Sequence, residues 1–177
     1  MPDKSHRYSA SMIVIHWLTA LLVLGDLATA LGREPGAEGG RKVAENPPLL
    51  HFSLGLAVLA LMLPRLVLRV AGRTPEADTQ GWLAAAAKAG HAVLYLFLIA
   101  LPITGWYTAS RMGVSVSFFG LQLPALTEPV PGRPGLIAEL HENAGTIILI
   151  LAGLHALMAI WHQFVLRDGT LRRMSLR

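Results

Sequence analysis

The chain of 177 residues contains no cysteine and few charged side chains. The lack of cysteine excludes disulfide bonds, cysteine-ligated iron–sulfur clusters and covalent attachment of haem through a Cys-x-x-Cys-His motif. Charged residues make up only 15% of the chain, whereas a typical soluble domain carries roughly 25%. The mean hydropathy is +0.50, and 53% of the residues are hydrophobic. This composition indicates an integral membrane protein rather than a soluble one.

Four apolar runs make up most of the chain, and each is long enough to cross a bilayer, which takes about 20 helical residues. They cover roughly residues 11–31, 48–70, 82–107 and 136–166. Pro64 and Pro102 lie inside two of the runs, where neighbouring helices in a membrane tolerate a kink. The linkers leave no room for a soluble module. We therefore expect an all-α fold, with residues 1–177 forming a single transmembrane domain built as a four-helix bundle.

The first run has an alternative interpretation as a cleaved signal peptide. Lys4 and Arg7 precede it, and Ala28-Thr29-Ala30 resembles a signal peptidase site. The run is long for the apolar part of a signal peptide, and it carries His16 near its start. We expect the run to be retained as the first span, because cleavage would discard this histidine.

The distribution of lysine and arginine predicts the orientation of the bundle. Ten of these residues flank one side of the expected spans and five flank the other. The richer side includes both termini and the second linker, and the positive-inside rule places it in the cytoplasm. The first and third linkers then face the periplasm of a bacterial inner membrane. The third linker contains an apolar stretch, residues 114–124, which we expect to cover the end of the bundle with Phe118 and Phe119 directed inward.

Four histidines lie toward the ends of the apolar runs: His16, His51, His141 and His155. Imidazole is costly to bury in lipid and is usually kept there for a function. His141 and His155 are 14 residues apart on one run, close to four helical turns, so they point the same way about 21 Å apart. The predicted orientation gives His51 the depth of His141 near the outer face, and His16 the depth of His155 toward the inner face.

Two matched pairs of histidines on different helices are what bis-imidazole ligation of haem requires. We therefore predict two stacked haems, the outer one held by His51 and His141 and the inner one by His16 and His155. A zinc or copper site or a proton relay is an alternative. A metal site usually gathers its ligands at one point, however, and most of the bilayer separates these pairs. A single intramembrane histidine can also simply form a hydrogen bond between helices.

Two further histidines, His91 and His162, lie toward the cytoplasmic ends of the third and fourth runs. A quinone head group needs a hydrogen-bond donor and a proton source when it is reduced, and histidine offers both. One interpretation is that these residues line a quinone pocket. The equally open alternative is that they lie in the interface and bind lipid or haem propionates. His91 is also an alternative to His16 as an inner haem ligand.

Charged side chains near the ends of the runs have several possible roles. Arg65 and Arg69 are cytoplasmic candidates for binding haem propionates. Asp26 lies within the first run, and an ionisable group inside a membrane is a functional hypothesis by default. It is placed toward the outer half of the membrane, where it could pair with an arginine or serve a proton path.

An ordered set of short segments resembles the bacterial cytochrome b561 family over essentially the whole chain. The matching segments are Ile15-His16-Trp17, His51, Leu66 to Arg69, Gly90-His91, Leu101-Pro102, Phe119-Gly120-Leu121, Leu123-Pro124, Leu140-His141-Glu142, Gly153-Leu154-His155, and then Asp168, Thr170, Leu171 and Met174. The resemblance implies a four-helix integral cytochrome with two haem b groups. Carried onto this chain, it gives the same ligand pairs as the depth argument.

One branch of that family takes electrons from periplasmic superoxide and reduces ubiquinone, and the compact size of this chain resembles that branch. The resemblance therefore implies a superoxide oxidase that has quinone, superoxide and membrane lipid as its partners and binds no nucleic acid. Cationic residues on the outer side, with Arg111, Arg41 and Lys42 as candidates, would steer superoxide toward the outer haem. The alternative is a haem-bearing membrane anchor that passes electrons between quinone and a dehydrogenase, hydrogenase or other protein donor.

Overall fold

The computed structural model describes residues 7–31, 48–72, 81–130 and 135–176. Within this part of the chain, four helices are long and apolar enough to cross a membrane, which confirms the predicted all-α fold with four spans. They are α1 (Ala10–Leu31), α3 (Leu49–Ala71), α4 (Trp82–Arg111) and α5 (Leu136–Trp161), and α5 continues into a π-helix, η2 (His162–Leu166). A short helix, α6 (Thr170–Arg173), follows.

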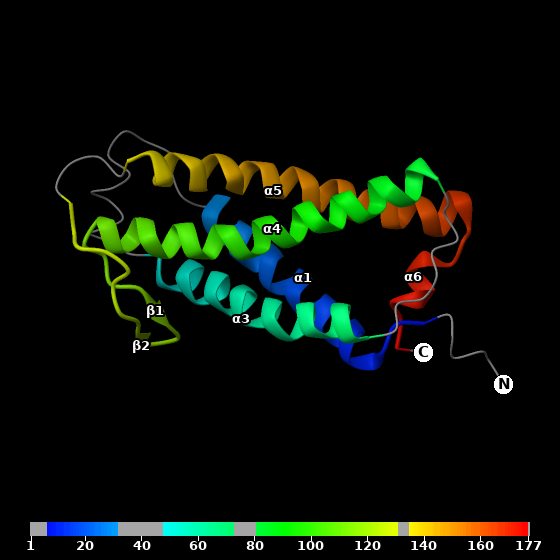
Figure 1. Ribbon diagram of the computed structural model, residues 1–177, viewed down its shortest axis with the longest axis horizontal. Helices are drawn as coiled ribbons and strands as arrows, with labels where there is room; N and C mark the ends of the chain where they lie inside the picture. The colour runs from blue at the N-terminus through cyan, green and yellow to red at the C-terminus, as the bar shows by residue number, and fades with distance from the viewer. Residues whose placement is uncertain (1–6, 32–47, 73–80, 131–134, 177) are drawn as a thin grey trace.

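The long helices pack against one another in chain order, α1 on α3, α3 on α4 and α4 on α5 (Figure 1). Much of their apolar surface faces outward: Leu21, Leu63 and Leu154, from three different helices, are all more than half exposed. Outward leucines suit lipid, because lipid tails are as apolar as leucine and there is little hydrophobic force to bury such side chains between helices.

Helix α4 continues four residues beyond the predicted end at residue 107. The extra turn contains Thr108, Ala109 and Ser110, whose small and partly polar side chains resemble those of a linker, yet all three are buried. The hydroxyl of Ser110 donates to the Trp106 carbonyl over 2.9 Å and accepts from the Leu126 amide over 3.1 Å. The Ser110 side chain therefore joins the following linker to α4, and the helix does not end at this polar residue.

A two-stranded hairpin covers this end of the bundle, formed by β1 (Ser117–Phe118) and β2 (Leu121–Gln122). The strands are antiparallel, and β1 packs against α3. Val114 and Val116 from this segment are buried with Ala109, which confirms the expectation that the segment covers the bundle end. Ser53 on α3 accepts a hydrogen bond from the Phe119 amide over 2.9 Å and so holds the hairpin in place.

The expectation that Phe119 points inward is wrong, since its side chain is 66% exposed, while Phe118 is partly buried. Phe119 and Gly120 form the two-residue turn of the hairpin, and both have positive φ, 47° and 96°. Positive φ at both loop positions is typical of the type I′ turns that join antiparallel strands. The geometry of the turn therefore directs Phe119 outward, and Val114 and Val116 are the buried residues beneath the hairpin.

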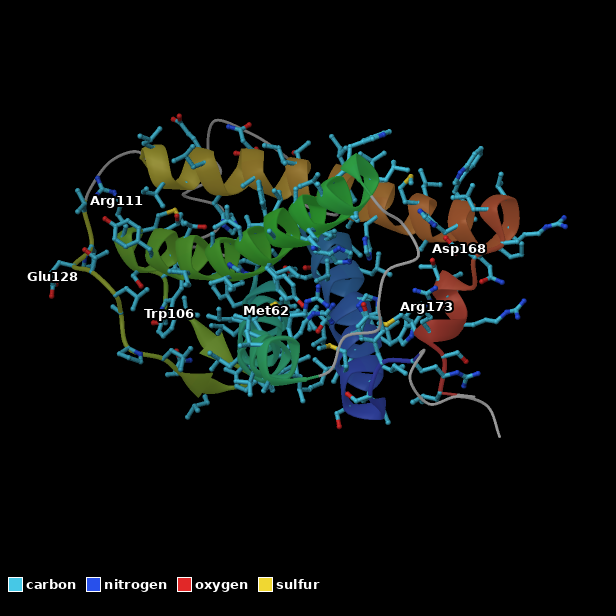
Figure 2. The ribbon with its side chains drawn as sticks, turned by 45° about the vertical axis from the view of Figure 1, so that its right-hand side comes forward. Met62, Trp106, Arg111, Glu128, Asp168 and Arg173 are labelled. Atoms are coloured by element: carbon cyan, nitrogen blue, oxygen red, sulfur yellow. The ribbon has the colours of Figure 1, made fainter. Side chains whose placement is uncertain are left out.

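The opposite end of the bundle holds the beginning and the end of the described chain. The Tyr8 amide donates to the Arg173 carbonyl over 3.3 Å, and Nε1 of Trp17 donates to the Met174 carbonyl over 2.9 Å. Figure 2 shows Asp168 and Arg173 at this end and Arg111 and Trp106 at the other. Helix α1 therefore starts beside α6, on the same side of the bundle.

Candidate functional site

Two pairs of histidine rings face each other across helix interfaces. The rings of His51 on α3 and His141 on α5 have centroids 6.2 Å apart, and those of His16 on α1 and His155 on α5 have centroids 6.3 Å apart. Two metal–imidazole bonds of about 2 Å, with about 1 Å from each nitrogen to its ring centre, require about 6 Å between centroids. Both pairs predicted from depth are therefore brought together at a spacing that suits one metal ion between each pair.

The outer pair, His51 and His141, already has partners for both Nδ1 atoms. Nδ1 of His51 lies 2.8 Å from Oδ1 of Asp26 and 3.4 Å from Oγ1 of Thr29. Nδ1 of His141 lies 3.2 Å from Oγ1 of Thr104, whose hydroxyl is 2.9 Å from the carbonyl of Ala100 and can therefore accept from the ring. If each Nδ1 donates its proton to such a partner, Nε2 of the same ring is the atom that can bind a metal, because the partner at one ring nitrogen fixes the role of the other.

Close packing around His141 depends on Gly105 of α4. A Cβ atom at this position would lie 2.9 Å from Cε1 of His141, which is closer than real contacts allow. Thr104 and Gly105 therefore position this ring by a hydrogen bond and by the space that a missing side chain leaves. Sequence reasoning missed both residues, since threonine and glycine are common in membrane helices and nothing in their spacing marks them.

The inner pair has a cation beside it. Nη2 of Arg65 lies 2.8 Å from Nδ1 of His16, and Nε of Arg65 donates to the Tyr95 hydroxyl over 3.2 Å. Arginine is only a donor, so Nδ1 of His16 accepts and the proton of the neutral ring is on Nε2. Ligation of iron through Nε2 would therefore require this contact to be released. Nη1 of Arg65 is buried and has no hydrogen-bond partner among the described residues, so the side chain can take up a carboxylate such as a propionate.

His91 lies beside the inner pair. Its ring centroid is 5.3 Å from that of His155, and its Nδ1 donates to the Ala87 carbonyl over 2.7 Å. The centroid distance is shorter than the about 6 Å that two metal–imidazole bonds require. His16 therefore fits the role of second inner ligand better than His91.

His162 directly follows α5, at the start of the π-helix η2, a type of helix that often marks functional sites. Its Nδ1 contacts Oδ2 of Asp168, and the other oxygen of Asp168 accepts from the amide and the hydroxyl of Thr170 over 3.0 and 2.6 Å. Partial burial would raise the pKa of Asp168, but the hydrogen bonds from His162 and Thr170 outweigh burial and hold this pKa below its usual range. Asp168 therefore faces His162 as a carboxylate.

The other candidate residues are less closely placed. Within the described part of the chain, no hydrogen bond or ring contact joins His91 to His162, and their place in one quinone pocket stays a prediction. Arg69 is in the last turn of α3, and Arg111 ends α4 close to Gly135. Arg41 and Lys42 lie outside the described residues. Asp26, for which an arginine partner or a proton path was considered, contacts His51.

The sequence model of a family described as prokaryotic cytochrome b561 matches residues 7–175. This chain belongs to the prokaryotic cytochrome b561 family. Membership makes it a haem b electron carrier of the cytoplasmic membrane. The histidine pairs of this cytochrome b561 fit that cofactor, because they combine metal-binding spacing with Nδ1 partners on the outer side.

Three relatives match this cytochrome b561 along nearly its whole length. A protein of Yersinia pestis named probable superoxide oxidase CybB is 33% identical over 95% of both chains. Cytochrome b561 homolog 2 of Escherichia coli is 30% identical over 97% of this chain and 93% of its own. A cytochrome b562 of Cereibacter sphaeroides is 31% identical over 94% of both chains.

Proposed function

We propose that this cytochrome b561 holds two haem b groups and transfers electrons from periplasmic superoxide to ubiquinone. The observation that carries the proposal is the presence of two histidine pairs at metal-binding spacing, with one member of each pair on α5. The outer pair is His51 with His141, and the inner pair is His16 with His155. The haems, when bound, supply one-electron carriers between a one-electron donor and a two-electron acceptor.

The overall reaction oxidises two superoxide anions to two molecules of dioxygen. The two electrons, together with two protons, reduce one ubiquinone to ubiquinol. No covalent bond to the protein is needed in this balance. The task of the chain is to bind the cofactors, to admit an anion at one end and to supply protons at the other.

At the donor end, the proposal gives Arg111 the role of attracting superoxide. It ends α4 at the periplasmic end assigned by the positive-inside rule, close to the start of α5 that carries His141. A cation near the entry of a site raises the local concentration of an anionic substrate, and salt screens the effect. Arg41 and Lys42 would add to the same field.

At the acceptor end, the proposal gives His162 the role of proton donor to the reduced quinone. The Asp168 carboxylate holds its ring from the Nδ1 side, and Thr170 in turn holds the carboxylate. Such a supported imidazole has a fixed orientation, as general acid–base catalysis requires. The assigned orientation places this end at the cytoplasm, which supplies the protons. Arg65 and Arg69 are proposed to bind the haem propionates on this side.

The choice of superoxide as donor is supported by one relative, which is named a probable superoxide oxidase. Other relatives are named only as cytochromes b561 or b562. This difference favours a second candidate function. In that function the chain is a haem-bearing anchor that passes electrons between quinone and a dehydrogenase, hydrogenase or other protein partner.

The test is a reduced-minus-oxidised spectrum with quantified haem on the purified protein, followed by superoxide as the only reductant with ubiquinone present. We expect two b haems per chain and rapid quinol formation that superoxide dismutase abolishes. An Arg111→Gln variant should lose part of the rate at low salt and little at high salt. Two haems that superoxide does not reduce would favour the anchor instead.

A further inference from the structure

The function proposed above leaves one carboxylate inside the membrane without a role. Oδ1 of Asp26 on α1 lies 2.8 Å from Nδ1 of His51 on α3, and the two side chains are only 21% and 23% exposed. Oδ1 is shielded from solvent, and although it lies close to Nδ1 of His51, it has no hydrogen-bond partner of suitable geometry among the described residues. A carboxylate inside a membrane is energetically costly, so its close contact with a candidate haem ligand requires an explanation.

The surrounding helix surface leaves room for this carboxylate. Gly55 follows His51 by four residues and therefore lies on the same face of α3. A Cβ atom at Gly55 would be 3.8 Å from Oδ2 of Asp26, so the second oxygen occupies the space above this glycine. Thr29 lies one turn after Asp26, and its hydroxyl donates to the Asp26 carbonyl over 2.7 Å. The carboxylate is thus held between α1 and α3 at the Nδ1 side of His51.

The geometry points to a positioning role, which we propose on the basis of the two-haem function above. We infer that the Asp26 carboxylate accepts the Nδ1 proton of His51, fixes the ring with Nε2 toward the iron and lowers the reduction potential of the outer haem. A metal-bound histidine commonly donates its other ring N–H to a partner of this kind, and a carboxylate partner raises the basicity of the ligand. A more basic ligand and a nearby negative charge both favour the oxidised, more positive iron.

Two other histidines of the site have partners of different charge. Nδ1 of His141 has a neutral hydroxyl, that of Thr104, and Nδ1 of His16 faces the cationic Arg65. A cation beside the inner site favours the reduced iron, whereas the anion beside the outer site disfavours it. The Asp26 carboxylate, and the Arg65 cation if it stays near the inner haem after releasing His16, would both favour electron transfer from the outer to the inner haem, which is the direction from superoxide to quinone.

The experiment is a potentiometric titration of the haem-loaded Asp26→Asn variant with the two haems resolved spectrally. At the outer midpoint potential of the unaltered protein, we expect the ratio of reduced to oxidised outer haem to rise about tenfold, a size taken from the change of about 10- to 100-fold that loss of such a partner causes in metal affinity or activity. This ratio corresponds to about 59 mV for a one-electron couple. The inner haem should keep its original potential. Asp26→Glu, which retains a carboxylate, should keep most of the original potential of the outer haem.

The matched control is Glu142→Gln, which removes an exposed carboxylate adjacent to His141 in the sequence. Glu142→Gln should leave the potentials of both haems unchanged. A shift of the outer potential equal to that in Asp26→Asn would show a general effect of removing a negative charge and would overturn the proposal. An unchanged outer potential in Asp26→Asn with two haems bound would also overturn it. If Asp26→Asn does not bind the outer haem, the potential of that haem cannot be measured in the variant. The near-infrared charge-transfer bands of the two haems in the unaltered protein are then compared. Bands at the same energy for both haems would overturn the proposal, and a band at a different energy for the outer haem would support it.

An experiment that overturns the positioning role of Asp26 can be distinguished from one that overturns the proposed function. A chain that binds fewer than two haems contradicts the proposed function before any potential is measured. Two haems with superoxide-driven quinol formation, together with an outer potential that ignores Asp26, overturn only the role of this carboxylate.

Discussion

Nη2 of Arg65 on α3 lies 2.8 Å from Nδ1 of His16 on α1, so a cation from one helix meets a candidate haem ligand from another. The same guanidinium lies over the ring of Tyr95, with 5.5 Å between Cζ and the ring centroid. This contact brings a positive charge next to the inner histidine pair, whereas the outer pair has the carboxylate of Asp26 beside it. The two sites therefore differ in electrostatic environment although their ring spacings are nearly equal.

Replacing Arg65 should lower the potential of the inner haem. In Arg65→Gln the positive charge is lost, so we expect the ratio of reduced to oxidised inner haem at its original midpoint potential to fall by about tenfold. The measurement is the same spectrally resolved titration. Arg172→Gln, which removes an exposed arginine of α6, is the control. A shift of equal size in both variants would contradict a local role for Arg65.

Removing one ligand should remove one haem. His141→Ala should lose the outer haem and keep most of the inner one, so the quantified haem should fall from two to about one per chain. His155→Ala should show the reverse loss. Haem that stays at two per chain in His141→Ala would show that the outer ligand assignment is wrong.

The space at Gly105 gives a test that leaves every ligand in place. Gly105→Ala puts a Cβ atom 2.9 Å from Cε1 of His141, so the ring must move and the outer haem should bind less tightly. We expect a loss of about tenfold or more in outer haem affinity, measured by competition with a haem-binding protein. Gly90→Ala on the same helix is the control, because a Cβ there meets no atom within 4 Å. Equal loss in both variants would indicate damage to α4 in general.

His162→Ala should keep both haems and slow the reduction of quinone. General acid–base groups contribute typically 10²- to 10⁴-fold, so a loss of about a hundredfold in the quinone-dependent rate is expected. The readout is quinol formation, with haem reduction by superoxide followed separately. A rate that is unchanged in His162→Ala would leave the proton donor role without support.

The pair of His162 and Asp168 also predicts how stability depends on pH. The pKa of Asp168 is lower in the folded chain than its ordinary value of about 4, because hydrogen bonds from His162 and Thr170 outweigh partial burial. The stabilisation is therefore present above that ordinary value and is lost as the pH falls through the lowered one. Thermal unfolding of the unaltered chain and of Asp168→Asn should differ at neutral pH and converge in acid. A difference that persists below pH of about 2 would contradict this account.

The histidine pairs could be predicted from the sequence because they depend on two regular quantities. The helical rise gives each residue a depth, and the charge bias of the linkers gives the direction of each span. The bonds around the rings depend instead on helix rotation and side-chain rotamers, which no periodic pattern encodes. Asp26 was therefore recognised as unusual without its partner His51, and Arg65 was assigned to propionates without its contact to His16.

Local chemistry explains the other differences between prediction and structure. Ser110 and its neighbours resemble a linker by composition, but the hydroxyl hydrogen-bonds within α4 and to the following segment, and the helix continues. Phe119 is apolar, but its place in a two-residue turn with positive φ outweighs its preference for burial. In both cases a backbone requirement outweighed side-chain character.

Helix α5 contributes one histidine to each pair, and it is the last long helix of the described chain. While a ribosome is still producing the chain, α1 and α3 can enter the membrane with His16 and His51, but each of these rings is without its opposite partner. Both pairs come into existence together when α5 inserts. A chain truncated before α5 would therefore keep only one histidine of each pair.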